Sequence, residues 1–287
     1  MQSKPSIVLV GGLSVRPVEW QPFIDNLPDR SVRIVDRSIL EHDQPGSELS
    51  RVRHELANWD TEIDHIAEAC LQEHQLGGPV ILVGHSMGAM LAEGVARLHP
   101  DLVGRLILLD GTIPYAVRGD ITRKSIVLRS GVELVSASLA ACAHWATARP
   151  MRAAAVKVTS IISKVRETSG DHAEQVAQEL ASPTVAKQIG AEFFADLVWA
   201  KKLARLQEQP LPARIDVVIA LGTRNPLGLV QRRWELWWRN RVTDLRAQAV
   251  KQTLKGNRCN IVSWLLPRCT HMIMGSQPRA LARIIGA

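Results

Sequence analysis

The chain has 287 residues, of which 46% are hydrophobic and 22% are charged, and its formal net charge is +7. This composition is ordinary for a globular protein, and a chain of this length can bury a large apolar core without disulfides or metals. The positive charges are scattered along the sequence, so we expect no nucleic-acid partner. The longest weakly charged segment, residues 134–150, is too short for a membrane span.

The four cysteines show neither a CxxC pattern nor a Cys/His spacing, so the sequence predicts no zinc site and no disulfide framework. Reduced thiols, and an N-terminal apolar run that is too short for a secretory signal, favour a cytoplasmic location. A peripheral contact with a membrane or lipid surface remains open. The sequence carries no signal for an oligomeric state.

Short apolar runs alternate with helical patterns along the first part of the chain. Strands are predicted at residues 6–10, 32–35, 80–83 and 106–109. Helices are predicted at residues 20–27, 59–72 and 87–98. This alternation is typical of an α/β protein whose parallel sheet is covered by helices on both faces.

The strand signal disappears between residues 112 and 211 and then resumes. Helices are predicted inside this segment at residues 126–145, 151–165, 171–180 and 183–206. Strands at 217–221 and 261–266 and helices at 229–254 and 278–285 follow. We therefore expect an α/β core formed by residues 1–111 and 212–287, with a mostly parallel sheet of about six strands and an inserted helical cap at 112–211.

The segment Gly84-His85-Ser86-Met87-Gly88 fits the pattern G-x-S-x-G and lies directly between a predicted strand and a predicted helix. A sharp turn at this junction forces the serine into strained backbone angles, and side chains two positions away would collide with the turn. Glycines at both positions remove those collisions. The serine hydroxyl then lies above the sheet, at a helix N-terminus that favours negative charge. Ser86 is the predicted nucleophile.

At this point the chain resembles the α/β-hydrolase superfamily, and the resemblance covers nearly its whole length. Residues 8–12 with Trp20 look like the first-strand segment of that family, and residues 106–111 look like the strand after the nucleophile helix. Residues 267–274 look like its histidine loop. The order and spacing are similar to a member that lacks the first two strands of the eight-stranded sheet. The resemblance implies an α/β-hydrolase fold.

A serine hydroxyl becomes a good nucleophile only when a positioned base takes its proton. His271 follows the last predicted strand, where a loop at the end of the sheet would bring it above Ser86. His271 is therefore the predicted general base. We expect the turn to direct His85 away from Ser86, into supporting packing.

Two residues compete for the role of the triad acid. In the family this carboxylate usually follows the strand predicted here at 217–221, but Asn225 stands in its place. Asparagine can hold an imidazole by a hydrogen bond, but it cannot stabilise the imidazolium by charge. Asp110 is our first choice, because the resemblance to certain lipases and to peptide-synthetase thioesterases allows the acid at this position. A carboxylate elsewhere, such as Glu235 or Asp244, is the remaining alternative.

The oxyanion hole needs two backbone N–H groups that point to the developing negative charge. One is expected to be that of Met87, which follows the nucleophile. The resemblance implies that the other is that of Leu13, after the Gly11-Gly12 turn. The donor is main chain, so the family's usual histidine is not needed at Gly11.

The helix predicted at 229–254 is rich in tryptophan and arginine. One stripe at helical spacing contains Val230, Trp234, Trp237, Trp238, Val242 and Leu245. Most of the basic side chains fall elsewhere: Arg232, Arg233, Arg239, Arg241 and Arg246. We interpret this helix as core-facing with a solvated basic side. The alternative is an interfacial or partner-binding helix.

Together these features predict a hydrolase that cleaves a small-molecule carboxylic ester or thioester through an acyl-enzyme on Ser86, with no metal and no organic cofactor. The abundance of Ala, Val, Leu and Ile in the cap favours an apolar acyl group. Acyl transfer or lyase chemistry at the same site is one alternative. A non-catalytic ligand-binding protein on the same fold is another, and Asn225 in the usual place of the acid is its main support.

Overall fold

A computed structural model describes residues 4–12, 15–27, 29–35, 58–111, 199–200, 202–206, 209–221 and 228–286, with the side chains of 221 and 228–237 left aside. The predicted cap therefore lies almost wholly outside the described residues, apart from its end near residues 199–211. Leu13 and Asn225, two of the predicted site residues, also lie outside them.

The sheet has six strands in the order β2-β1-β3-β4-β5-β6, and all neighbouring strands are parallel. The strands are β1 (Ile7–Val10), β2 (Val32–Val35), β3 (Val80–His85), β4 (Val103–Leu109), β5 (Arg214–Leu221) and β6 (Asn260–Pro267). This arrangement confirms the prediction of a mostly parallel sheet of about six strands. Each predicted strand has its counterpart in the described structure.

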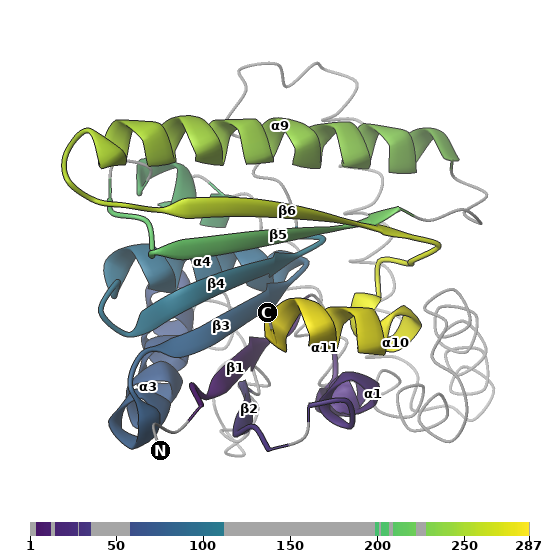
Figure 1. The fold of residues 1–287 in the computed structure, drawn as a ribbon, viewed down its shortest axis with the longest axis horizontal. Coiled ribbons are helices and arrows are strands. Elements are labelled where there is room, and N and C mark those ends of the chain that lie inside the picture. Colours follow the sequence, from purple (N-terminus) through teal and green to yellow (C-terminus); the bar gives the residue numbers. More distant parts are fainter. Residues whose placement is uncertain are drawn as a thin grey trace, which may run out of the picture.

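Helices cover both faces of the sheet (Figure 1). The described helices are η1 (Pro17–Trp20), α1 (Gln21–Ile24), α3 (Trp59–Gly77), α4 (Met87–Leu98), α9 (Gly228–Thr253), α10 (Ile273–Ser276) and α11 (Pro278–Gly286). Apolar side chains of α3, α4 and α9 share one core with one face of the strands. Those of α1, α10 and α11 share a second core with the other face.

The strand order reverses direction between β1 and β3. The chain leaves β1 toward one edge of the sheet to form β2 and returns on the other side of β1 to form β3. The helices that follow β1 and β3, α1 and α4, pack on opposite faces of the sheet. In open α/β sheets, a crevice at such a switch point is the usual place for a ligand.

Several element bounds differ from the sequence prediction: β5, for example, begins at Arg214 instead of residue 217, and α3 ends at Gly77 instead of residue 72. Strand β4 begins at Val103, three residues before the predicted start, because Arg105 lies within the sheet. Its Nε donates to Asp216 Oδ2 on β5 at 2.6 Å, and its Nη atoms donate to the carbonyls of Ile284 and Ile285 at the end of α11. The short helix α10, which directly follows the predicted histidine loop, has no counterpart in the prediction.

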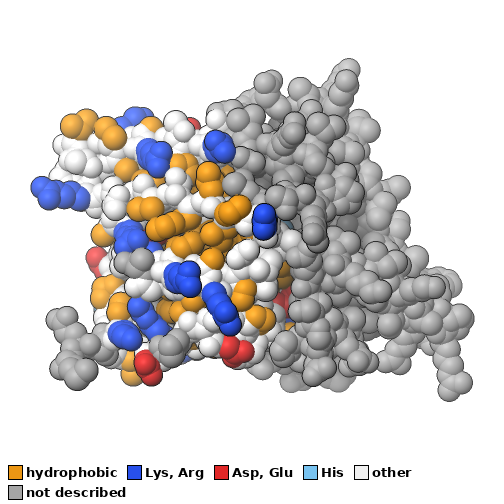
Figure 2. Space-filling view, turned by 45° about the vertical axis from the view of Figure 1, so that its right-hand side comes forward, with side chains coloured by type: hydrophobic (Ala, Val, Ile, Leu, Met, Phe, Trp, Pro, Cys, Tyr) orange, Lys and Arg blue, Asp and Glu red, His pale blue; other side chains and the backbone are white. Residues whose placement is uncertain are grey.

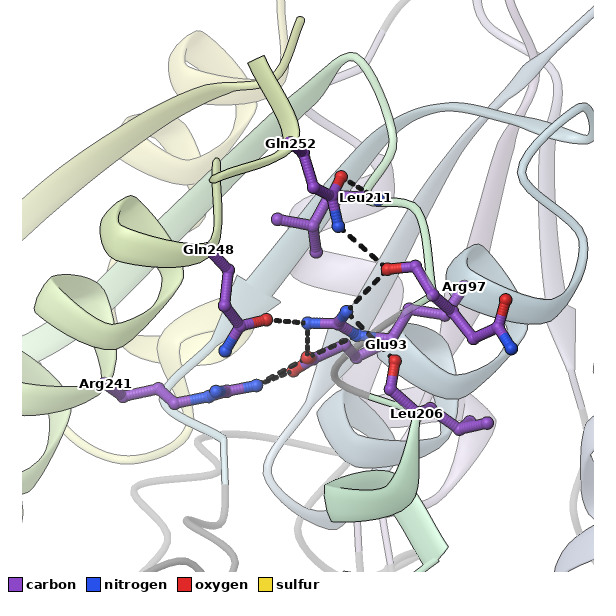
Figure 3. A network of polar contacts seen from close by, with 8 residues as sticks. Glu93, Arg97, Leu206, Leu211, Arg241, Gln248 and Gln252 are labelled. Atoms are coloured by element: carbon purple, nitrogen blue, oxygen red, sulfur yellow. Dashed lines mark hydrogen bonds and ion pairs between the residues drawn. The ribbon is translucent and has the colours of Figure 1, made fainter. Parts of the chain in front are cut away.

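A buried ionic cluster joins α4 to α9 (Figure 3). The carboxylate of Glu93 accepts hydrogen bonds from Arg97 at 2.8 and 2.9 Å and from Arg241 at 2.5 and 2.6 Å. Arg97 also donates to the carbonyls of Leu206 and Gln209, so the chain that returns from the predicted cap is fixed to the core here. We call Glu93, Arg97 and Arg241 the ionic cluster.

Burial of Arg241 contradicts the prediction that it lies on a solvated basic side of its helix. The side chain of Arg241 is 5% exposed, because its partner Glu93 lies on the neighbouring helix. The members of the apolar stripe whose side chains are described behave as predicted, since Trp238, Val242 and Leu245 are buried in the core. These three side chains of α9 thus pack in the same core as the strands.

The described surface mixes charge and apolar groups. On the face shown in Figure 2, Lys and Arg side chains stand mostly apart from one another among apolar and neutral groups. On this face the positive charge is spread out and does not gather in one patch. None of the helices in the described part of the chain is long and apolar enough to cross a membrane.

Candidate active site

Ser86 occupies a sharp turn between β3 and α4. Its backbone angles are φ 53° and ψ −124°, a strained conformation for a residue with a side chain. A Cβ added at Gly84 would lie 2.6 Å from Ala89 Cα, and one added at Gly88 would lie 2.5 Å from the carbonyl oxygen of Val10. Only glycine fits at these two positions, so the turn has the form that the motif predicts.

The loop after β1 passes directly beside the serine hydroxyl. A Cβ added at Gly12 would lie 2.5 Å from Ser86 Cβ and 3.1 Å from Ser86 Oγ. The backbone of this loop therefore lies so close to Ser86 that a side chain at position 12 would collide with it. This proximity places the segment that ends at Gly12 where a main-chain donor could serve the site.

Three side chains from distant parts of the sequence form one chain of hydrogen bonds. Ser86 Oγ lies 3.0 Å from His271 Nε2, and His271 Nδ1 lies 2.7 Å from Asp110 Oδ2. A carboxylate can only accept, so Nδ1 carries the proton that it donates to Asp110. In the neutral ring Nε2 is then an acceptor, and it faces the hydroxyl of Ser86 with the lone pair that a general base needs.

The sheet brings Asp110 and Ser86 to the same edge. Strands β3 and β4 are neighbours, and His85 at the end of β3 is aligned with Leu109 at the end of β4. The N–H of Ser86 donates to the carbonyl of Leu109 at 2.9 Å, and the N–H of Asp110 donates to the carbonyl of Val218 at 2.8 Å. Each residue thus directly follows a paired strand, which fixes its position.

Burial differs along this chain of hydrogen bonds. The side chain of Asp110 is 4% exposed, and its second oxygen accepts from the N–H of Ala220 at 3.4 Å. The imidazole of His271 is 46% exposed. The carboxylate of Asp110 is therefore buried and held in place. The imidazole of His271 is partly exposed, so a substrate can approach it.

The loop that carries His271 is fastened on both sides of that residue. The N–H of Thr270 donates to Ser276 Oγ at 3.2 Å. The carbonyl of His271 accepts from the N–H of Ile273 at 3.0 Å and from Nε2 of His85 at 2.8 Å. Since β6 is an edge strand, this loop runs back across the sheet to Ser86, and these contacts hold it there.

Of the predicted site residues, the structure brings together Ser86, His271 and Asp110. Met87 is the first residue of α4, and the first N–H groups of a helix have no acceptor within that helix. Leu13 and Asn225 lie outside the described residues. The role of His85 was missed in part: the residue is buried as expected, but it also contacts the base.

Two thiols in the described part of the chain, those of Cys70 and Cys259, are poor competitors for the role of nucleophile. Burial raises the pKa of the Cys70 thiol to about 12 and that of the Cys259 thiol to about 11, so both stay protonated at neutral pH. Within the described ranges, no group of three or more His, Cys, Asp and Glu side chains is arranged to hold a metal ion. The reactive groups that the structure brings together at the carboxyl end of the sheet are the hydroxyl of Ser86, the imidazole of His271 and the carboxylate of Asp110.

Comparison with known proteins identifies the family. The model of the Alpha/beta hydrolase family matches residues 7–284. The chain is 29% identical over 127 residues to (E)-2-((N-methylformamido)methylene)succinate hydrolase of Acinetobacter baylyi, over 44% of this chain and 45% of that protein. It is 34% identical over 108 residues to pimeloyl-[acyl-carrier protein] methyl ester esterase of Methylococcus capsulatus, over 38% of this chain and 37% of that protein.

These alignments span less than half the length of the curated relatives. Among solved structures, wild-type Cfl2 from Burkholderia cenocepacia aligns with a TM-score of 0.61 and 19% identity, over 100% of this chain and 88% of that chain. At this identity the likeness concerns the fold. Because the family model covers nearly the whole sequence, the chain belongs to the alpha/beta hydrolase family.

Proposed function

We propose that this protein is a serine hydrolase that cleaves a carboxylic ester or thioester with an apolar acyl group through an acyl-enzyme on Ser86. The observation that carries the proposal is the continuous chain of hydrogen bonds from Asp110 through His271 to Ser86. Relatives named as a hydrolase and as a methyl ester esterase support the reaction class.

The proposed reaction proceeds in two steps. His271 Nε2 takes the proton of Ser86 Oγ while the oxygen attacks the acyl carbon, and the same nitrogen then gives that proton to the leaving alcohol or thiol. The acyl group stays on Ser86. A water molecule then attacks the acyl carbon, His271 takes its proton, and the carboxylic acid leaves as Ser86 Oγ recovers a proton.

Asp110 is the proposed acid of the triad. Its carboxylate keeps the proton of His271 on Nδ1 and stabilises the imidazolium that forms in each step. Its burial favours this role, because a charge acts more strongly where water is excluded. Asn225 remains the alternative from the sequence.

The proposed oxyanion hole uses the N–H groups of Met87 and Leu13. Support for Met87 comes from its place as the first residue of α4, next to the nucleophile. Support for Leu13 comes from Gly12, whose backbone lies against Ser86. Residues 112–211 are the proposed cap above this site, and their apolar composition is the reason to expect an apolar acyl group.

The test is covalent labelling with a fluorophosphonate, read as the intact mass of the protein. We expect one adduct on the native chain and none on Ser86→Ala or His271→Ala. Ser263→Ala is the matched control, because it removes an exposed hydroxyl of β6 that accepts from Arg246 and not from a triad residue, and it should be labelled like the native chain. A folded native protein that forms no adduct would favour the non-catalytic binding role.

A positive result leads to the substrate class. Acyl esters and acyl thioesters of increasing chain length would be compared by kcat/KM, with water and a competing alcohol as acceptors. A rise of kcat/KM with chain length supports the apolar acyl group. Transfer of the acyl group to the alcohol in preference to water would replace hydrolysis by acyl transfer.

A further inference from the structure

We infer that His85 is a positioning residue for the general base, and that it joins the nucleophile turn and the histidine loop into one unit. His85 is the chain neighbour of Ser86, and its imidazole Nε2 lies 2.8 Å from the carbonyl oxygen of His271. The backbone of the base is therefore bonded to the residue next to the nucleophile. This inference rests on the proposed function, since it assigns a role within that reaction.

The direction of this hydrogen bond follows from its chemistry. A carbonyl oxygen can only accept, so Nε2 of His85 carries a proton and donates it. The tautomer of His85 is thereby opposite to that of His271, whose proton is on Nδ1. The two rings therefore act differently, since that of His85 donates to a backbone carbonyl and that of His271 accepts from a hydroxyl.

Packing reinforces the hydrogen bond. The ring of His85 lies against that of His271 with a centroid distance of 4.8 Å, and Trp20 contacts the ring of His85 edge-on at 6.3 Å. Trp20 and His85 are both fully or almost fully buried. The buried ring of His85 thus packs against both Trp20 and the more exposed imidazole of His271, which supports the position of the base.

A closed ring of contacts results. Ser86 Oγ meets His271 Nε2 at 3.0 Å, the carbonyl of His271 meets His85 Nε2 at 2.8 Å, and the peptide bond between His85 and Ser86 completes the circuit. A shift of the histidine loop would have to stretch one of these contacts. The arrangement therefore fixes the distance on which proton transfer depends.

The role is separable from folding. The carbonyl of His271 also accepts from the N–H of Ile273, so this carbonyl would keep a partner after loss of His85. His85→Leu removes the donor and the ring, whereas His85→Gln keeps an N–H donor on a side chain of similar reach. His65→Leu on the exposed side of α3 is the matched control for loss of a histidine.

The experiment measures the rate constant of fluorophosphonate labelling at Ser86, with thermal unfolding to verify that each variant is folded. For His85→Leu we expect a rate about 100-fold below that of the native chain, the size of effect that misplacement of a catalytic group produces. His85→Gln should recover most of this loss, and His65→Leu should react like the native chain. With a substrate, His85→Leu should lower kcat and leave KM nearly unchanged.

A second readout separates positioning from simple packing. The Nδ1 proton of His271 that is donated to Asp110 should give a low-field proton NMR signal that is absent in His271→Ala. The signal should persist in His85→Gln and broaden or shift in His85→Leu. A folded His85→Leu with the native labelling rate and signal would overturn the inference, as would a His85→Gln variant as slow as His85→Leu. If the native chain is not labelled at all, the proposed function itself fails.

Discussion

The molecule contains two polar groupings, each built around a buried carboxylate, that differ in how far the partners of that carboxylate are exposed. In the ionic cluster, the carboxylate of Glu93 is held by two guanidinium groups that are 0% and 5% exposed. In the candidate active site, the carboxylate of Asp110 is held on one side by the backbone and on the other by an imidazole that is 46% exposed. Both use an anchored acid, but only one has a partner that reaches the surface.

The difference concerns which groups can change their proton. Arginine stays protonated in proteins, so the ionic cluster keeps its charges fixed and ties α4 to α9. Histidine gains and loses a proton near neutral pH, and His271 has a hydroxyl at its outer nitrogen. A buried grouping of fixed charges stabilises the fold, whereas a partly exposed grouping with a titratable member can catalyse. Substitutions that break one grouping at a time test this difference.

The largest effect is expected for His271→Ala. Removal of the base should lower kcat by about 10⁶-fold, as for a triad whose members act as a unit. The free energy of unfolding should change little, because half of this side chain is already exposed. Steady-state turnover and urea unfolding measure the two effects. A variant that retains much of its activity would exclude His271 as the general base.

The second largest loss of activity is expected for Asp110→Asn, which should lower kcat by about 10⁴-fold. The amide can still contact Nδ1 of His271, but it brings no negative charge to stabilise the imidazolium. Asn225→Ala is the matched comparison, because that residue is the alternative partner of the base. The assignment of Asp110 would be reversed if Asn225→Ala lost the activity and Asp110→Asn kept it.

The sequence alone predicted those elements that are marked by a local residue pattern. Apolar runs located the strands, and Gly84 and Gly88 located the turn at Ser86, because both patterns depend on near neighbours in the chain. The expected start of β4 was wrong, because Arg105 looks like a polar terminator until Asp216 on the next strand is known to pair with it. That partner lies 111 residues away in the sequence.

The candidate site shows the same limit. The sequence left the role of the triad acid open between Asp110, Asn225 and a carboxylate elsewhere, and only the spatial arrangement puts the carboxylate of Asp110 against His271. Arg241 was assigned to a solvated surface for a similar reason, since its burial depends on Glu93 in another helix. The contact of His85 with the base depends on a loop 186 residues further along the chain. Partners so distant in sequence leave no local pattern.

Glu93→Gln addresses the ionic cluster alone. It removes one negative charge from between two buried guanidinium groups, so we expect a loss of about 3–5 kcal/mol in the free energy of unfolding. The labelling rate of the folded fraction at Ser86 should be unchanged. Glu68→Gln on the exposed side of α3 is the control, with an expected effect within about 0.5 kcal/mol. Equal stability of the two variants would mean that the cluster does not stabilise the fold.

The dependence of stability on pH gives the smallest effect. Burial alone would raise the pKa of Glu93, but the charges and hydrogen bonds of Arg241 and Arg97 outweigh it and lower the pKa from 4.5 to about 2. A carboxyl whose pKa is lower in the folded state stabilises the fold fully above its unfolded value. This contribution, about 3 kcal/mol, is lost as the pH falls from about 4.5 to about 2.

Urea unfolding of the native chain and of Glu93→Gln over this pH range measures the contribution. The native chain should lose stability more steeply than the variant, so the difference between them should shrink toward pH 2. Parallel curves would show that Glu93 binds its proton equally in both states, and that its guanidinium partners do not hold it as a fixed charge. Labelling of Ser86 at neutral pH should meanwhile be equal in both proteins, because the ionic cluster has no member in the chain of hydrogen bonds that ends at the nucleophile.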